Sequence, residues 1–100
     1  MEQILIPQKY RDLAEKLRQV MLELTGVDAC KQTRARAVVV PRAMVAWILV
    51  SEGCTTFQAG ALLGKNHATI SHYKDLMADF LSSPGYDAER ELWTKFQERI

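Results

Sequence analysis

The chain is built around the sequence Thr55-Thr-Phe-Gln-Ala-Gly-Ala-Leu-Leu-Gly64-Lys-Asn-His-Ala-Thr-Ile-Ser-His-Tyr-Lys74. Thr55 followed by Gln58 matches a capping box, which predicts a short helix over residues 56–63. Gly64 suits the left-handed conformation of a tight turn, and Asn66 is a good N-cap for a second helix over 67–81. The stretch therefore predicts a helix-turn-helix.

The second helix of this motif is amphipathic. At about 100° per residue, its apolar side chains gather on one side: Ile70, Tyr73, Leu76, Met77, Phe80 and Leu81. The opposite side is short and polar in the first turns and becomes acidic only at Asp75 and Asp79. A DNA-recognition helix has this pattern, because it reaches base edges with its N-terminal residues.

The rest of the chain predicts three more helices, and so an all-α fold in one helical bundle over residues 1–100. Apolar spacing after Pro7 predicts a helix over 8–25, with Gly26 as its left-handed stop. Pro41 is placed as the first residue of an almost wholly apolar helix, 41–52, at the centre of the bundle. Asp87 is expected to cap a last helix over 87–99.

Composition bounds the class of protein. The chain has 100 residues, of which 48% are hydrophobic, enough for one domain with a core. It lacks a signal pattern and an apolar run near the roughly 20 residues of a membrane span, so we expect a cytoplasmic protein without a membrane partner. Cys30 and Cys54 lack metal-ligand spacing and are expected to be buried or half-buried thiols.

Positive charge is concentrated in the middle of the chain. Residues 29–74 hold six Lys and Arg residues and one acid, Glu52, a balance of +5. Residues 1–28 carry four bases and five acids, and residues 75–100 carry three and six, so these flanks come to −1 and −3. Phosphate contacts are electrostatic and local, so this asymmetry indicates a nucleic-acid partner better than the net charge of +1 does.

The segment Lys31-Gln-Thr-Arg-Ala-Arg-Ala37 contains only positive charges. It is either an exposed connecting loop that happens to be basic or an arm that lies along a DNA backbone or enters a minor groove, where arginine is favoured. Arg42 is expected in the first turn of the 41–52 helix, either on a phosphate or extended to solvent.

Catalytic and metal chemistry have little support in the sequence. His67 and His72, at i and i+5, do not share a helix face closely, so a metal site is not expected. Ser71 and His72 are adjacent, and no third catalytic group or oxyanion loop accompanies them. We therefore expect neither an enzyme nor a cofactor.

These motifs together resemble a known family. A basic loop, Pro-Arg opening an apolar helix, a glycine turn and Lys65-Asn-His-Ala-Thr-Ile-Ser-His72 look like the C-terminal DNA-binding domain of the bacterial replication initiator DnaA. The likeness covers roughly residues 20–81. It implies that Arg34 enters the minor groove with Arg36 on the backbone, that Arg42 binds phosphate, and that residues 66–72 read the major groove.

The complete set of candidate DNA-binding residues joins these positions to the neighbouring polar ones. They are Lys31, Arg34, Arg36, Arg42, Thr55, Lys65, Asn66, His67, Ala68, Thr69, Ser71, His72 and Lys74.

Three departures from the family pattern bear on the target. Asn66 replaces the usual aspartate, Ala68 replaces a threonine, and a Gly-Gly-Arg is shortened to Gly64-Lys65. Aspartate accepts from cytosine, whereas asparagine prefers adenine's donor and acceptor pair, and Ala68 offers a methyl to thymine. We therefore expect a site related to the DnaA box but different from it.

The resemblance implies a sequence-specific binder of double-stranded DNA that acts in replication control or transcription regulation, of the kind that phages and mobile elements encode. No G-x-x-x-x-G-K-[ST] sequence occurs, so ATP binding in the initiator's manner is not expected. A homodimer, or a replication or transcription protein as partner, stays open. The alternative is a protein-interaction module that uses the bundle as a scaffold.

Overall fold

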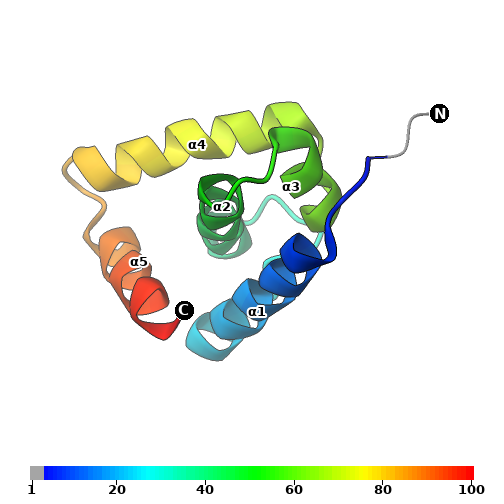
Figure 1. Cartoon of the computed structure of the whole chain (residues 1–100). Coiled ribbons are helices and arrows are strands. Elements are labelled where there is room, and N and C mark those ends of the chain that lie inside the picture. Colours follow the sequence, from blue (N-terminus) through cyan, green and yellow to red (C-terminus); the bar gives the residue numbers. More distant parts are fainter. Residues whose placement is uncertain (1–3) are drawn as a thin grey trace.

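The computed structural model describes residues 4–100, which fold into five helices with no strand in that range (Figure 1). These are α1 (Gln8–Thr25), α2 (Arg36–Ser51), α3 (Thr56–Leu63), α4 (His67–Ser82) and α5 (Asp87–Arg99). The all-α class is confirmed. The predicted bounds of α1 and α3 are those observed, and α4 extends one residue further.

Helix α2 is the centre of the bundle, with the other helices arranged around it (Figure 1). Its buried side chains run from Val38 to Leu49, which confirms the expected central position. The predicted start was wrong, because α2 begins at Arg36 and Pro41 lies inside it. An interior proline costs about 3 kcal/mol. Burial of Val38 and Val40, at about 1.5–3 kcal/mol each, offsets that cost.

Helices α1 and α5 close the bundle on the side opposite α4. Leu17 and Met21 of α1, and Trp93 and Phe96 of α5, belong to the same buried core as α2. Gly26 ends α1 in the left-handed conformation, as predicted, with φ at 73°. Helix α5 has the predicted bounds, 87–99, but Asp87 is its first helical residue and not its cap, because Tyr86 holds the N-cap position.

The predicted helix-turn-helix is present as α3, the turn Gly64–Asn66 and α4. The capping box is complete, since the Thr55 side chain accepts from the Gln58 N–H and the Gln58 side chain accepts from the Thr55 N–H. Gly64 is left-handed, with φ at 70°. The turn also passes so close to Gly60 that a β-carbon there would lie 2.4 Å from the Lys65 carbonyl oxygen. Gly60 is therefore the residue that lets α3 and the turn meet.

Two further expectations concern membranes and thiols. Within residues 4–100, no helix combines the length and the apolar character needed to cross a bilayer. Cys54 is buried and Cys30 half-buried, both as free thiols, and burial raises the pKa of each thiol above its ordinary value. Both cysteines therefore stay protonated and weakly nucleophilic at neutral pH.

Candidate nucleic-acid interface

The outward face of α4 has the predicted composition. Ile70, Tyr73, Met77 and Phe80 are buried against the bundle. The exposed residues of the first turns are short or polar, followed by one cation: His67, Ala68, Ser71, His72 and Lys74. Short side chains let a helix backbone approach a groove closely, so the start of α4 has the shape that base contacts require.

Asn66 serves α4 as its N-cap, as predicted. Its Oδ1 accepts from the Thr69 N–H at 2.9 Å and from the Thr69 hydroxyl at 3.1 Å. These two bonds occupy both lone pairs of the oxygen. The expected pairing with adenine needs Oδ1 as an acceptor; it stays a prediction, and it requires Oδ1 to leave at least one of these bonds. Only the amide N–H groups of Asn66 stay available, and Thr69 belongs to the cap.

A stacked aromatic pair fixes the first residue of α4. The His67 imidazole lies on the Phe57 ring of α3, with ring centroids 4.2 Å apart and planes 21° from parallel. Phe57 is 52% exposed, although it is a large apolar side chain. The pair holds the His67 ring at the junction of α3 and α4 and leaves an aromatic edge open to solvent.

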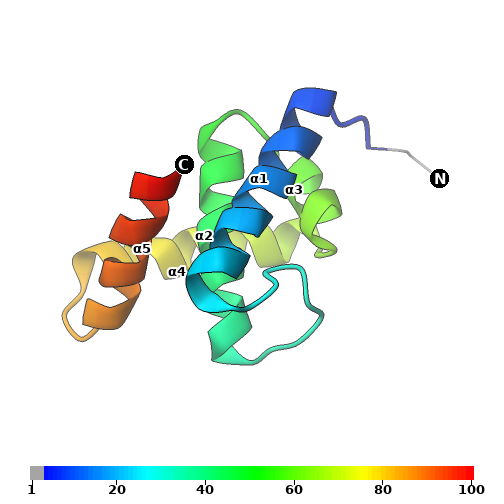
Figure 2. The same cartoon turned by 90° about the horizontal axis from the view of Figure 1, so that it is seen from below.

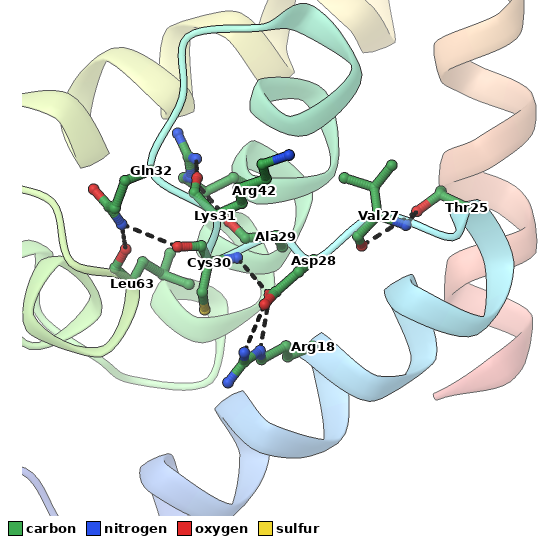
Figure 3. Close-up of polar contacts among 10 residues, drawn as sticks. All are labelled: Arg18, Thr25, Val27, Asp28, Ala29, Cys30, Lys31, Gln32, Arg42 and Leu63. Carbon is green, nitrogen blue, oxygen red and sulfur yellow. Dashed lines mark hydrogen bonds and ion pairs between the residues drawn. The ribbon is translucent and has the colours of Figure 1, made fainter.

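The α1–α2 loop, residues 26–35, is held by specific contacts although it has no regular structure (Figure 3). Its beginning forms a turn in which the Lys31 N–H donates to the Asp28 carbonyl at 3.0 Å. The Arg18 guanidinium donates twice to the Asp28 carboxylate, at 2.8 and 2.6 Å. These bonds lower the pKa of Asp28, and the Cys30 N–H adds to the effect.

Arg42 does not occupy the position predicted for it. It lies within α2 rather than in the first turn, and it is only 1% exposed. Its guanidinium donates to the carbonyl oxygens of Ala29, at 2.9 Å, and Thr33, at 3.3 Å, and to that of Lys31. It also donates to the Tyr73 hydroxyl of α4 at 3.1 Å. The Arg42 guanidinium is therefore buried and hydrogen-bonded within the protein, and it cannot contact a phosphate in this conformation.

The loop also contacts the turn of the helix-turn-helix. The Gln32 side-chain amide donates to the Cys30 carbonyl at 3.0 Å and reaches the Leu63 carbonyl at 3.5 Å (Figure 3). A β-carbon on Gly64 would lie 2.9 Å from the Gln32 nitrogen, so this contact depends on glycine in the turn. The loop, which Figure 2 shows as the extended segment between α1 and α2, therefore lies against the end of α3 and the turn that precedes α4.

Arg36 was expected on the DNA backbone beside Arg34, but its side chain lies against α5. It is the first residue of α2, and its guanidinium donates to the Glu89 carboxylate of α5 at 2.8 Å. This bond lowers the pKa of Glu89. The side chain also lies over the Phe80 and Tyr86 rings, so Arg36 stabilises the junction of α2 and α5.

Apart from the buried Arg42, four of the predicted basic residues stay outside the ion pairs found among residues 4–100. Lys31 and Arg34 are exposed in the loop, Lys65 is half-buried in the turn, and Lys74 is exposed on α4. Thr55, at the start of α3, is exposed but uses its hydroxyl oxygen in the capping box. The candidate interface thus consists of these four unpaired cations and the polar start of α4.

Sequence reasoning missed four residues that shape this surface: Gln32, Phe57, Gly60 and Tyr73. A helical glycine between two alanines is an available signal for a close backbone approach at Gly60. The roles of the other three depend on contacts between distant parts of the chain, for which the sequence carries no local signal.

Comparison with protein-family models, with curated proteins and with solved structures returned no match to this chain.

Proposed function

We propose that the protein binds double-stranded DNA in a sequence-specific manner, with α4 in the major groove and the α1–α2 loop on the adjoining backbone or minor groove. One observation carries this proposal. Gln32 of the loop reaches the Leu63 carbonyl at 3.5 Å, so the segment that contains Lys31 and Arg34 borders the turn that contains Lys65 and precedes the short, polar start of α4. Duplex recognition requires cations that neutralise phosphates and short polar side chains that contact bases. The unpaired cations supply the first and the start of α4 supplies the second.

Each residue of the surface has a distinct role in this proposal. His67, Ser71 and His72 present hydrogen-bonding groups to base edges, and Ala68 presents a methyl to thymine. Asn66 contributes donors only, since its oxygen caps α4. It would therefore favour acceptors such as guanine N7 and O6, thymine O4 or a phosphate oxygen.

The sequence resemblance supports a target related to the DnaA box, and a role in replication control or transcription regulation. A domain of this size contacts few base pairs, so we propose that useful affinity comes from two copies on neighbouring half-sites or from a DNA-bound partner protein.

Selection from a pool of randomised duplexes tests the proposal directly. We expect one short motif to be enriched, with affinity that falls steeply as salt increases. If the four unpaired cations each neutralise one phosphate, the slope of log K against log salt is about −3 to −4. Failure to enrich any motif at low salt would contradict base-specific binding.

Two arginines of neighbouring position provide a matched pair for this experiment. Arg34→Ala should weaken binding to all sequences and reduce the salt slope by about one. Arg36→Ala removes the same charge from the chain but breaks the pair with Glu89 instead. Equal losses from both changes would mean that overall charge, and not the proposed surface, governs binding.

The alternative of a protein-interaction module, with the acidic C-terminal helix as its contact, has weaker support. Asp87, Glu89 and Glu91 of α5 are each paired with a cation of the chain itself. A negative gel shift, together with specific recovery of one partner protein, would favour this alternative over DNA binding.

A further inference from the structure

Arg42 connects three parts of the molecule that are separate in the sequence. It belongs to α2, its guanidinium bonds three carbonyl groups of the α1–α2 loop, and it also bonds Tyr73 of α4. Among residues 4–100, no carboxylate pairs with it. A buried guanidinium without a counter-charge is tolerated only where its donors are satisfied, so these contacts hold one another in place.

The pattern of carbonyls shows how the loop is held. Every second residue of this stretch directs its carbonyl oxygen towards the same guanidinium. These residues are Ala29, Lys31 and Thr33. The loop backbone is thereby fixed along its length. The exposed side chains of Lys31 and Arg34 are attached to this fixed stretch.

Tyr73 provides the connection to α4. It lies on the buried face of that helix, 4% exposed, one turn from Ile70. Its hydroxyl accepts from Arg42, whose donor nitrogen also reaches the Thr33 carbonyl at 3.3 Å. A shift of α4 would therefore move Arg42 and the loop with it.

We propose that Arg42 and Tyr73 are positioning residues that couple the α1–α2 loop to α4, so that both halves of the DNA surface keep one fixed spacing. The role of this coupling in binding rests on the proposed function, whereas the contacts that produce the coupling do not depend on it. A surface whose parts are already in place loses less conformational entropy on binding, which strengthens binding without a new contact.

Hydrogen exchange in the free protein tests the coupling without any DNA. Tyr73→Phe removes the hydroxyl and keeps the ring, while Arg42 retains its carbonyl partners. We expect the bonded amides of Lys31 and Thr33 to exchange about tenfold faster, with the amides of α1 and α5 unchanged. Tyr86→Phe is the matched control, because Tyr86 packs on Phe80 at the other end of α4.

Unchanged exchange of the loop amides in Tyr73→Phe would overturn the coupling. So would a uniform increase over all helices, because that result means a general loss of stability.

Affinity measurements on the selected duplex then test what the coupling does. We expect Tyr73→Phe to weaken binding by several fold, and Arg34→Ala to cost less in the Tyr73→Phe protein than in the wild type. Additive effects of the two substitutions would overturn the role of the coupling in binding. If the wild type binds no duplex at all, the proposed function fails, while the exchange experiment still decides whether the loop and α4 are coupled.

Discussion

The start of α4 and the α1–α2 loop form the two halves of the candidate interface, and they are stabilised in opposite ways. At the start of α4, the cap joins Asn66 to Thr69, three residues apart. The loop depends on contacts between residues far apart in sequence, since Gln32 and Leu63 are separated by 31 positions, as are Arg42 and Tyr73. One half is specified by its neighbours in the chain, and the other by the assembled bundle.

This difference predicts which substitutions disturb the structure of each half. A locally capped helix start should tolerate changes elsewhere in the molecule. A loop held by α1, α2, α3 and α4 should lose its shape when any one of those contacts is removed. Substitutions that affect one half and spare the other measure the difference.

Arg42→Ala should have the largest effect, because it leaves the carbonyls of Ala29, Lys31 and Thr33 without their shared donor and opens a cavity. We expect the free energy of unfolding to fall by about 3–5 kcal/mol, measured by urea denaturation. Arg36→Ala in the same helix is the control, and an exposed ion pair such as that with Glu89 is worth about 1 kcal/mol or less. Similar losses for the two arginines would contradict the special position of Arg42.

Gly60→Ala should be next in size, since it displaces the turn on which both halves depend. The new β-carbon would meet the Lys65 carbonyl oxygen, a backbone atom that cannot rotate away. We expect a loss of about 2–3 kcal/mol in thermal or urea unfolding. Helix propensity alone predicts the opposite sign, a gain of about 1 kcal/mol. A measured gain in stability would therefore show that the close approach is absent.

Asn66→Ala should affect only the start of α4. Loss of the cap costs about 1 kcal/mol, and exchange of the Thr69 amide should become faster while that of the loop amides stays constant. Asn66→Asp keeps an acceptor oxygen and adds a negative charge at the helix N-terminus, so it should restore the stability. Faster exchange in the loop of Asn66→Ala would mean that the two halves are less independent than their contacts indicate.

Asp28→Asn should have the smallest effect, and one that depends on pH. The bond from Arg18 lowers the pKa of Asp28 in the folded protein, so its contribution is present above the ordinary value near 4 and is lost as pH falls through the folded value. The Asp28 side chain is 36% exposed, so we expect less than about 1 kcal/mol at pH 7.

Asparagine at position 28 can still accept the Cys30 N–H, so the comparison isolates the charge. Unfolding curves of the two proteins should converge as pH falls from 6 to 3. A difference that persists at low pH would point to lost packing instead.

Much of the fold could be predicted because its signals are local. Gly26 and Gly64 stop helices where a left-handed residue is needed, Asn66 and the Thr55 box begin them, and the apolar face of α4 follows from helical spacing. A local signal also gave the wrong start for α2, which was placed at Pro41. Its local preference for a helix start is weaker than the burial of Val38 and Val40, which only the packed core supplies.

The sequence by itself determined which residues are polar, basic and exposed at the start of α4, since helical periodicity assigns each side chain to a face. Only the tertiary structure decided what the arginines do. Arg34 stays in solvent, Arg36 pairs with α5, and Arg42 is buried under the loop. The three share a charge and a neighbourhood in the sequence, but a guanidinium is directed by the acceptors around it, and those come from distant parts of the chain.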